Sequence, residues 1–441
     1  MSERATRAVA DWLDAVPDHW EVGNIRRFAR MKTGHTPSRG EPTYWADCTI
    51  PWFTLADVWQ LRDGRQRFLG DTSEKISELG LQNSAAELLP AGTVVLSRTA
   101  SVGFTGIMPV PMATSQDFWN WVCEPNLLPD FLYWQLCAMG HKFRQLTNGS
   151  THKTIYQGDA ASLEVCVPPL HTQRRIARFL NEKTVRIDGL IEKKRALLYR
   201  LAEKRQALIT RAVTKGLDPA APMKPSGIDW LGEIPAHWGL VPFKWRCSVQ
   251  SGQVDPLDPA YSSMPLIAPD HIESATGRLW EVATAEEQGA ISGKYLCPIG
   301  SVLYSKIRPA LRKVTLYDKE CLCSADMYAI DPGRDLDRKY LFYFFLTDAF
   351  TSYAELESLR VAMPKVNRDA LGAFPLPIPP LHEQARIALF CVKADEMHRE
   401  AGDQLTTSIE KLEEYRAAVI AAAVTGKLAM DAQPERECEE V

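Results

Sequence analysis

PPLHTQRRIARFL, at residues 168–180, recurs almost unchanged as PPLHEQARIALFC at residues 379–391, an offset of 211. The stretch AVTKGL at 212–217 recurs as AVTGKL at 423–428, at the same offset. A third pair, DWLDAVPDHWEV at 11–22 and DWLGEIPAHWGL at 229–240, is 218 residues apart. Repetition of several separate landmarks along one chain indicates a duplicated architecture. We therefore expect two units, each with a globular part followed by a long segment.

The long segment after each double proline has the spacing of a helix. After Pro169 the next proline is Pro219, and apolar residues recur three, four or seven positions apart between them. The segment between Pro380 and Gly426 has the same spacing. Each predicted helix has about 40 residues and a length of about 60 Å, and we expect the two to pair as an antiparallel coiled coil. The predicted seam residues are Ile176, Leu180, Ile187, Leu190, Leu197, Leu201 and Leu208 in the first helix, and Ile387, Met397, Leu405, Ile409, Leu412 and Val419 in the second.

The segments between these helices mix two kinds of pattern. β-rich runs such as GTVVLSR at 92–98 and GSVLYSKI at 300–307 alternate with helical stretches such as the one at 338–357. The predicted fold class is α+β, with two tandem repeats that each consist of a globular α/β part and a long helix. The predicted boundaries are a globular part at 1–169, a helix at 170–217, a globular part at 218–380, a helix at 381–428 and an acidic tail at 429–441.

Length and composition limit the class of protein. A chain of 441 residues with 45% hydrophobic content suggests two or more globular domains. No apolar run approaches the roughly 20 residues that cross a bilayer, and the first residues lack the apolar region of a signal peptide. We therefore expect a cytoplasmic protein without a membrane partner. Ten cysteines without a CxxC pair predict reduced thiols rather than a zinc site.

Motifs of the familiar enzyme classes do not occur. The sequence has no glycine-rich dinucleotide loop, no complete phosphate loop, no two-histidine helix and no nucleophile elbow. The double prolines are followed by leucine and begin helices, which differs from the motif that holds a target base in amino-methyltransferases. We predict no catalytic residue, no metal ligand and no cofactor bound by this chain.

The charge of the chain is close to balanced, with a net value of −4. A non-specific nucleic-acid binder is usually basic throughout, whereas basic residues here form local clusters at 26–32, 62–67 and 306–313 and an excess between Gln173 and Lys215. Each cluster is compatible with ordinary solvated surface. The excess on the first helix is also compatible with docking to an acidic partner.

The order of these motifs resembles the specificity subunit of a type I restriction-modification system. The resemblance rests on the paired WLxx(I/V)PxHW motif, on KTGHTPSRGEPTYW at 32–45 followed by IPWFTLADV at 50–58, on LPAGTVVLSRTASVGFTGI at 89–107, and on the two PPLH helix starts. It covers nearly the whole chain. The second unit departs from the pattern, because VQSGQVDPLDPAYSS at 249–263 lacks the Thr-Pro-Ser loop.

The resemblance implies two target recognition domains that each bind one half of a split double-stranded DNA sequence. It also implies that the coiled coil docks two modification subunits, which would bind S-adenosylmethionine and methylate adenine. Restriction subunits that use ATP and magnesium would join them. Two alternatives stay open from the residues alone: a self-contained nuclease or other DNA-acting enzyme, and a scaffold that binds only protein.

Polar residues in or near the glycine-rich loops are the candidate DNA contacts, because backbone can approach phosphate there and arginine can reach a guanine edge. Arg98 is the strongest candidate for a base contact. The predicted contacts are Lys32, Thr36, Ser38, Arg39, Arg98, Thr99 and Lys153 in the first unit, and Gln253, Lys306, Arg308, Arg312, Lys365 and Arg368 in the second.

Overall fold

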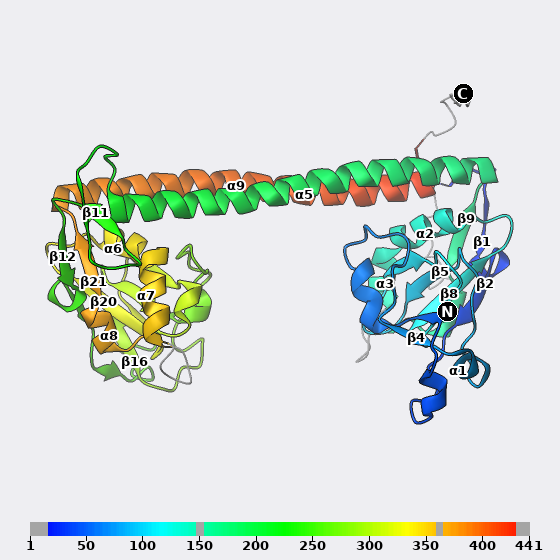
Figure 1. Cartoon of the computed structure of the whole chain (residues 1–441), viewed down its shortest axis with the longest axis horizontal. Helices are drawn as coiled ribbons and strands as arrows, with labels where there is room; N and C mark the ends of the chain where they lie inside the picture. Colours follow the sequence, from blue (N-terminus) through cyan, green and yellow to red (C-terminus); the bar gives the residue numbers. More distant parts are fainter. Residues whose placement is uncertain (1–15, 147–153, 359–364, 429–441) are drawn as a thin grey trace. The chain divides into compact units, whose positions relative to one another are not determined.

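The computed structural model describes residues 16–146, 154–358 and 365–428. The chain divides into two compact units, one formed by residues 1–195 with 407–441 and the other by residues 196–406. The division passes through the middle of both long helices, so each unit contains one globular part and half of each helix (Figure 1).

In its described residues, unit 1 combines three small sheets with four short α-helices. A four-stranded sheet has the order β2-β8-β5-β6, a three-stranded sheet has the order β4-β3-β7, and β1 pairs with β9. The elements are β1 (Glu21–Asn24), β2 (Ala29–Thr33), β3 (Ile50–Phe53), β4 (Glu74–Ile76), α1 (Glu78–Gln82), β5 (Val94–Ser97), β6 (Thr105–Ile107), β7 (Ala113–Thr114), β8 (Phe118–Cys123), α2 (Pro129–Ala138), α3 (Gly140–Leu146), α4 (Gln157–Ala161), β9 (Glu164–Val167) and the first part of α5 (Leu170–Lys215).

Unit 2 repeats this plan. Its four-stranded sheets have the orders β13-β20-β17-β18 and β14-β16-β19-β15, and β12 pairs with β21. The elements are β10 (Met223–Pro225), β11 (Glu233–Pro235), β12 (Gly239–Pro242), β13 (Cys247–Val249), β14 (Gln253–Val254), β15 (Leu266–Ile267), β16 (Lys294–Cys297), β17 (Val302–Ser305), β18 (Val314–Leu316), β19 (Cys321–Cys323), β20 (Met327–Pro332), α6 (Arg338–Phe345), α7 (Asp348–Ser358), α8 (Arg368–Ala373), β21 (Pro375–Ile378) and the first part of α9 (Leu381–Val424). The tandem α+β fold predicted from the sequence is confirmed.

A buried glutamine fixes the start of each long helix. Gln173 accepts a hydrogen bond from Leu128 N (2.8 Å) and donates to Asn126 O (2.8 Å) and Pro168 O (2.7 Å). Gln384 makes the matching bonds, from Asp337 N (2.8 Å) and to Asp335 O (3.1 Å) and Pro379 O (2.9 Å). Each buried glutamine side chain therefore satisfies backbone groups of a loop in the globular part and of the turn before the helix, so the glutamine of the PPLHxQ motif joins the helix to its globular part.

The tryptophan-rich motif packs against the end of a long helix. In unit 1, Gly426 has φ +75° and a Cβ there would lie 2.5 Å from Pro17 and 3.2 Å from Trp20. In unit 2, Gly216 has φ +76° and faces Trp238 and Pro235 in the same way. A glycine in the left-handed conformation is a common helix terminator. The motif therefore occurs twice because each copy covers one helix end, and residues 11–15 of the first copy lie outside the described residues.

The two helices pair within each unit, with a seam that differs in part from the prediction. In unit 1, Asp188 contacts Arg416 and Arg195 contacts Glu413; in unit 2, Arg205 contacts Asp395. One series of buried or half-buried positions in α5 alternates in steps of three and four, as expected of a helix seam: Leu180, Thr184, Ile187, Ile191, Lys194, Leu198, Leu201, Arg205, Leu208 and Ala212.

Leu190, Leu197 and Met397, predicted as seam residues, do not lie in the buried part of the seam. These side chains are 49%, 50% and 63% exposed. The leucine spacing is misleading because Thr184, Lys194 and Arg205, which are polar, occupy three of the seam positions. Ile176, Leu180, Ile187, Ile387, Ile409 and Val419 are buried, and Leu201, Leu208, Leu405 and Leu412 are half-buried.

The hydrophobic core of each unit includes its helix ends. In unit 1, Val419 and Val424 of α9 and Leu180 of α5 join the cluster around Trp121 and Phe131. The cluster of unit 2 contains residues of both helices in the same way. None of the helices in the described part of the chain is apolar over a length that could cross a membrane, and the nine described cysteines are free thiols.

Candidate nucleic-acid interface

The loop after β2 is held by two tryptophans. Trp52 Nε1 donates to His35 O (3.2 Å) and Trp45 Nε1 donates to Ser38 O (3.0 Å), and the two rings meet edge to face at 5.5 Å. At the start of the loop, a Cβ on Gly34 would lie 2.0 Å from Thr114 O. Only glycine allows this approach, so the Gly-x-Thr-Pro-Ser segment is fixed at both ends before any ligand binds.

Two of the predicted contacts in this region already have acidic partners. Lys32 Nζ lies 2.7 Å from Glu87 Oε2. Arg39 lies over the ring of Trp45, with its guanidinium carbon 3.8 Å from the centroid, and forms an ion pair with Glu74 at 2.5 Å. Both pairs are well exposed to solvent, and such ion pairs are weak. A phosphate could therefore replace the carboxylate at modest cost.

Thr36 and Arg98 come together at one end of the β2-β8-β5-β6 sheet. This end contains the last residues of β2 and β5 and the first of β8, because Thr33 pairs with Trp119 and Ser97 with Phe118. Thr36 Oγ1 donates to Gln116 Oε1 (2.7 Å), and Arg98 N donates to the adjacent Asp117 O (2.9 Å).

A second segment joins this sheet end. Ile155 N donates to Arg98 O (2.9 Å), and Thr99 forms a β-bridge with Thr154. The guanidinium carbon of Arg98 lies 4.4 Å from the centroid of Trp119, whose Nε1 donates to Ile155 O (3.0 Å). Stacking on an aromatic face restricts the arginine to few rotamers. Arg98 is therefore held in place before any ligand arrives.

Unit 2 builds the same arrangement from different side chains. Lys306 N donates to Asp326 O (3.0 Å), and Val366 N donates to Lys306 O (2.9 Å). Lys306 Nζ lies 5.4 Å from the centroid of the Tyr328 ring. The backbone contacts of Arg98 and Lys306 are equivalent, so in each unit this position carries a cation that lies over an aromatic ring at the same sheet end.

Two further predicted contacts lie around Tyr328. Arg368 places its guanidinium carbon 5.7 Å from the same ring and donates to Gln250 O (2.5 Å), and Lys365 is an exposed residue next to Ile307. Burial raises the pKa of Tyr328, against the opposing charge of Arg368. Tyr328 is therefore neutral at physiological pH, and its hydroxyl donates to Val366 O (3.1 Å).

The remaining predicted contacts of unit 2 show no contact with the Tyr328 ring within the described residues. Arg312 forms an ion pair with Asp348 at the start of α7. Gln253 opens β14 of the other sheet, opposite Tyr295. Arg308 is exposed and has φ +47°. In unit 1, Lys153 lies outside the described residues.

Comparison with known proteins identifies the family. The model of the family described as "Type I restriction modification DNA specificity domain" matches residues 17–198 and 275–410, which together are well over half of the chain. The chain belongs to this family. The EcoDI specificity subunit of Escherichia coli is 27% identical over 433 residues, which cover 94% of this chain and 89% of the relative. The MjaVIII specificity subunit of Methanocaldococcus jannaschii is 22% identical, with 90% and 92% covered.

Two solved structures share the fold of this specificity-domain protein. A chain from a study of complex assembly and conformational transition in the type I restriction-modification system has a TM-score of 0.66 at 16% identity, covering 94% of this chain and 99% of that one. The HsdS subunit of Thermoanaerobacter tengcongensis has a TM-score of 0.53 at 15% identity, covering 94% and 98%. At these identities the likeness concerns the fold.

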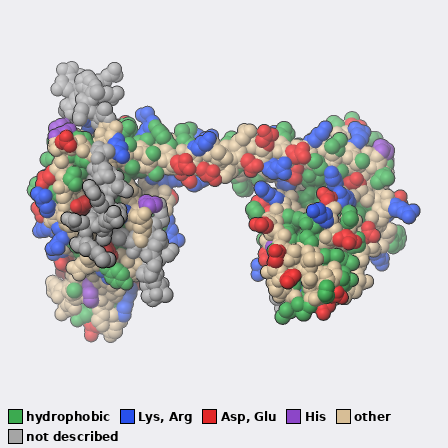
Figure 2. Space-filling view, turned by 180° about the vertical axis from the view of Figure 1, so that it is seen from behind, with side chains coloured by type: hydrophobic (Ala, Val, Ile, Leu, Met, Phe, Trp, Pro, Cys, Tyr) green, Lys and Arg blue, Asp and Glu red, His purple; other side chains and the backbone are tan. Residues whose placement is uncertain are grey.

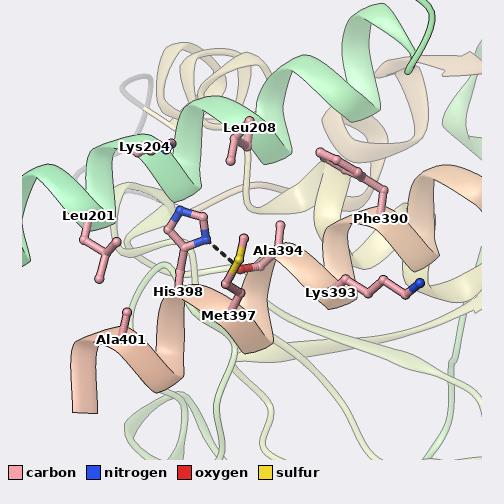
Figure 3. A pocket seen from close by; sticks show the side chains of 9 residues that line it. All are labelled: Leu201, Lys204, Leu208, Phe390, Lys393, Ala394, Met397, His398 and Ala401. Atoms are coloured by element: carbon pink, nitrogen blue, oxygen red, sulfur yellow. Dashed lines mark hydrogen bonds between the residues drawn. The ribbon is translucent and has the colours of Figure 1, made fainter. Parts of the chain in front are cut away.

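Clusters of metal ligands and grooves are the next features of this specificity-domain chain. The described residues contain no group of three His, Cys, Asp or Glu side chains that could hold a metal ion. A groove of about 540 Å³ lies between α5 and α9 in unit 2. It is lined by leucine, phenylalanine and methionine side chains and by Lys204 and Lys393, and the buried His398 lies between the two helices with its Nδ1 donating to Ala394 O (2.7 Å) (Figure 3). Its lining contains no acid and base in contact.

Charge on this specificity-domain protein is finely mixed. On the face in Figure 2, Lys and Arg side chains alternate with Asp and Glu instead of forming one continuous basic surface. The cluster at 62–67 is an example, because Arg65 pairs with Glu192 (2.8 Å) and Arg67 with Asp130 (3.1 Å). Arg65 and Arg67 therefore form ion pairs within unit 1, and a basic cluster in the sequence does not by itself indicate a surface for DNA.

The sequence interpretation missed the aromatic residues that order the interface. The predicted contacts include none of Trp45, Trp52, Trp119 and Gln116. The signal that could have found the first two is the position of YW and IPWF directly around the glycine-rich loop. Trp119 and Tyr328 occupy matching strands, so alignment of the two units would also have paired them.

Proposed function

We propose that this chain is the sequence-recognition subunit of a type I restriction-modification complex and that each unit reads one half of a bipartite double-stranded DNA target. The observation that carries the proposal is the repeated sheet end, where Arg98 over Trp119 in unit 1 matches Lys306 over Tyr328 in unit 2. Two readers with the same framework and different cations suit two different half-sites. Divergence between loops 34–45 and 250–263 agrees with this.

Catalysis in this proposal belongs to partner subunits. Two modification subunits would dock on the paired helices, bind S-adenosylmethionine and methylate adenine, and restriction subunits would supply ATP- and magnesium-dependent cleavage in the cytoplasm. The exposed Leu190, Leu197 and Met397 support a docking role, because apolar side chains outside the seam are available to a partner. The chain itself would bind no cofactor.

The test uses the chain assembled with its modification subunits. Methylation of a randomised DNA library should show two short preferred sequences at a fixed spacing. Arg98→Ala should cost about 1 to 3 kcal/mol of binding free energy and relax preference at one position of one half-site, as expected for a base contact. Arg98→Lys should retain more affinity than Arg98→Ala but not restore the preference, because lysine lacks the bidentate fork. Arg27→Ala is the control, since Arg27 is exposed and pairs only locally with Glu21.

Replacement of residues 229–378 by the matching part of a relative tests the independence of the readers. It should change one half of the methylated sequence, and an altered preference in both halves would contradict independent reading. Incubation of the purified chain alone with DNA and magnesium or S-adenosylmethionine tests the alternative of a self-contained enzyme. Cleavage or methylation by the chain alone would favour that alternative.

A further inference from the structure

An arginine from one long helix reaches a loop of the recognition domain in unit 1. Arg416 of α9 donates from Nη2 to Gly64 O (2.6 Å), in the turn that follows the 3-10 helix Leu55–Leu61. Its Nε lies 2.9 Å from Asp188 Oδ1 of α5, and both side chains are less than a fifth exposed. One guanidinium therefore joins α9, α5 and the recognition domain. Arg65, next to Gly64, adds an ion pair with Glu192 one turn further along α5.

Unit 2 contains the same contact with the helices exchanged. Arg205 now comes from α5 and donates from Nη1 to Ala275 O (3.1 Å), while it forms an ion pair with Asp395 of α9. Asp395 also accepts from the hydroxyl of Tyr343 in α6 (3.4 Å). The arginine side chain is 12% exposed. Again a single guanidinium joins both helices to a loop of the recognition domain.

The two contacts occupy equivalent positions of the duplication. Arg205 and Arg416 are 211 residues apart, as are Gly64 and Ala275, and this is also the offset of the two PPLH motifs. Both acceptor residues have a left-handed backbone, with φ +65° and +61°. The carboxylates do not follow the offset, since Asp188 and Asp395 are 207 residues apart, about one helical turn away. The arginine and the loop carbonyl are therefore the common elements.

The hydrogen bond from each arginine does not depend on the side chains of the loop that accepts it. Each arginine binds a main-chain carbonyl, which every residue type supplies, so the side chains of the recognition domain can differ without loss of the contact. A charge-assisted bond in a partly dry environment is stronger and more directional than an exposed ion pair. The same type of contact therefore attaches two domains with different loop sequences to the paired helices.

We propose that Arg416 and Arg205 are positioning residues that hold each recognition domain in one orientation on the helices of its own unit and thereby restrict the spacing of half-sites that the chain accepts. This inference rests on the proposed function. Neither arginine is placed at the DNA-facing sheet end, so their effect on DNA is indirect. The expected signature is a change in spacing tolerance without a change in base preference.

The test compares Arg416→Ala, Arg205→Ala and the double variant Arg416→Met with Asp188→Leu, which removes both charges of a pair and so avoids leaving one buried without a partner. Arg178→Ala is the matched control, because Arg178 is an 82% exposed arginine on α5 whose ion pair is with Glu182 of the same helix. Each protein is assembled with modification subunits and given a library of the two half-sites at varied separation.

The wild-type chain and Arg178→Ala should methylate one separation preferentially. In the other variants the preference over adjacent separations should fall by about tenfold, the size of effect expected when a hydrogen bond from a charged group is lost, while the preferred bases stay the same. A variant that weakens every separation equally would have only a structural defect and would overturn the proposal. A wild-type complex without any sequence preference would instead overturn the proposed function.

A second measurement does not need DNA. Loss of a hydrogen bond from a charged group should make local opening about tenfold more frequent. Amide hydrogen exchange of the free chain should therefore accelerate by about tenfold at residues 62–67 in the Arg416 variants and at residues 273–277 in Arg205→Ala. Each change should be confined to its own unit, so each variant serves as the control of the other. Unchanged exchange at both turns would show that the arginines do not hold the loops, whatever the DNA experiment gives.

Discussion

Replacement of Gln173 by leucine should destabilise unit 1 through loss of a polar network with little change in shape. The Gln173 side chain is fully buried and makes three hydrogen bonds to backbone groups, with Leu128 N, Asn126 O and Pro168 O. Leucine has a similar volume but satisfies none of these groups. At about 1 kcal/mol for each bond, the expected loss in the free energy of unfolding is about 3 kcal/mol.

For a unit of this size, that loss should lower the melting temperature of one transition by about 6 to 12 °C. The assay is calorimetric unfolding of the free chain, together with the matching variant Gln384→Leu. Gln384→Leu should lower the transition of unit 2 by a similar amount, and the double variant should show both effects additively because the sites are in different units.

The matched control is Gln404→Leu, at an exposed position of α9. It should change the free energy of unfolding by less than about 0.5 kcal/mol. The reasoning would be refuted if Gln173→Leu behaved like Gln404→Leu, because the buried network would then contribute nothing to joining helix and domain.

Three further outcomes are expected. Gly34→Ala should displace the loop after β2, since its Cβ would lie 2.0 Å from Thr114 O; DNA titration should show reduced affinity for one half-site, with the circular dichroism spectrum unchanged. Ile191→Ala should cost about 2 to 5 kcal/mol in urea unfolding because Ile191 is in the seam, whereas Leu197→Ala should be near neutral. Hydrogen bonding from Arg65, followed by its charge, lowers the pKa of Glu192; its stabilisation is present above the ordinary value of 4.5 and is lost as pH falls through the lowered value. Glu192→Gln should therefore lower the melting temperature at pH 7 and have no effect at pH 2.

The arrangement of the fold was accessible from the sequence because duplication leaves matching landmarks. The PPLH motifs, the glycines at the helix ends and the tryptophan motif all mark places where backbone geometry or close packing restricts the residue type. The seam was predicted only in part. Apolar spacing identifies the buried face of a helix well where every seam residue is apolar. Here Thr184, Lys194 and Arg205 are polar seam residues, so a pattern of apolar residues alone selects the exposed Leu190 and Leu197 instead.

The candidate site was harder to predict because a charged side chain gives no local sign of its partner. Arg98, Lys306 and Arg368 lie beside aromatic rings at the sheet ends, whereas Arg312 pairs with Asp348. The residues next to them in the sequence do not distinguish a cation that lies over an aromatic ring from one that forms an ion pair. The sequence analysis does not predict a role for Arg205 and Arg416 for the same reason. Their separation of 211 residues, which equals the offset of the PPLH motifs, is the signal that they occupy equivalent positions of the two units.

The participation of α9 in the core of unit 1 has a consequence for synthesis of the chain on the ribosome. Val419, Ile420, Ala423 and Val424 complete a core whose other members are at residues 20–180, and Cys166 Sγ donates to Val424 O (3.0 Å). Multidomain chains usually fold from the amino terminus as they emerge. Here the core of the first recognition domain is complete only after residues 419–424 have been translated. The core of unit 2, by contrast, is complete once residues 196–406 have been translated. The domain made second is the first that can finish folding.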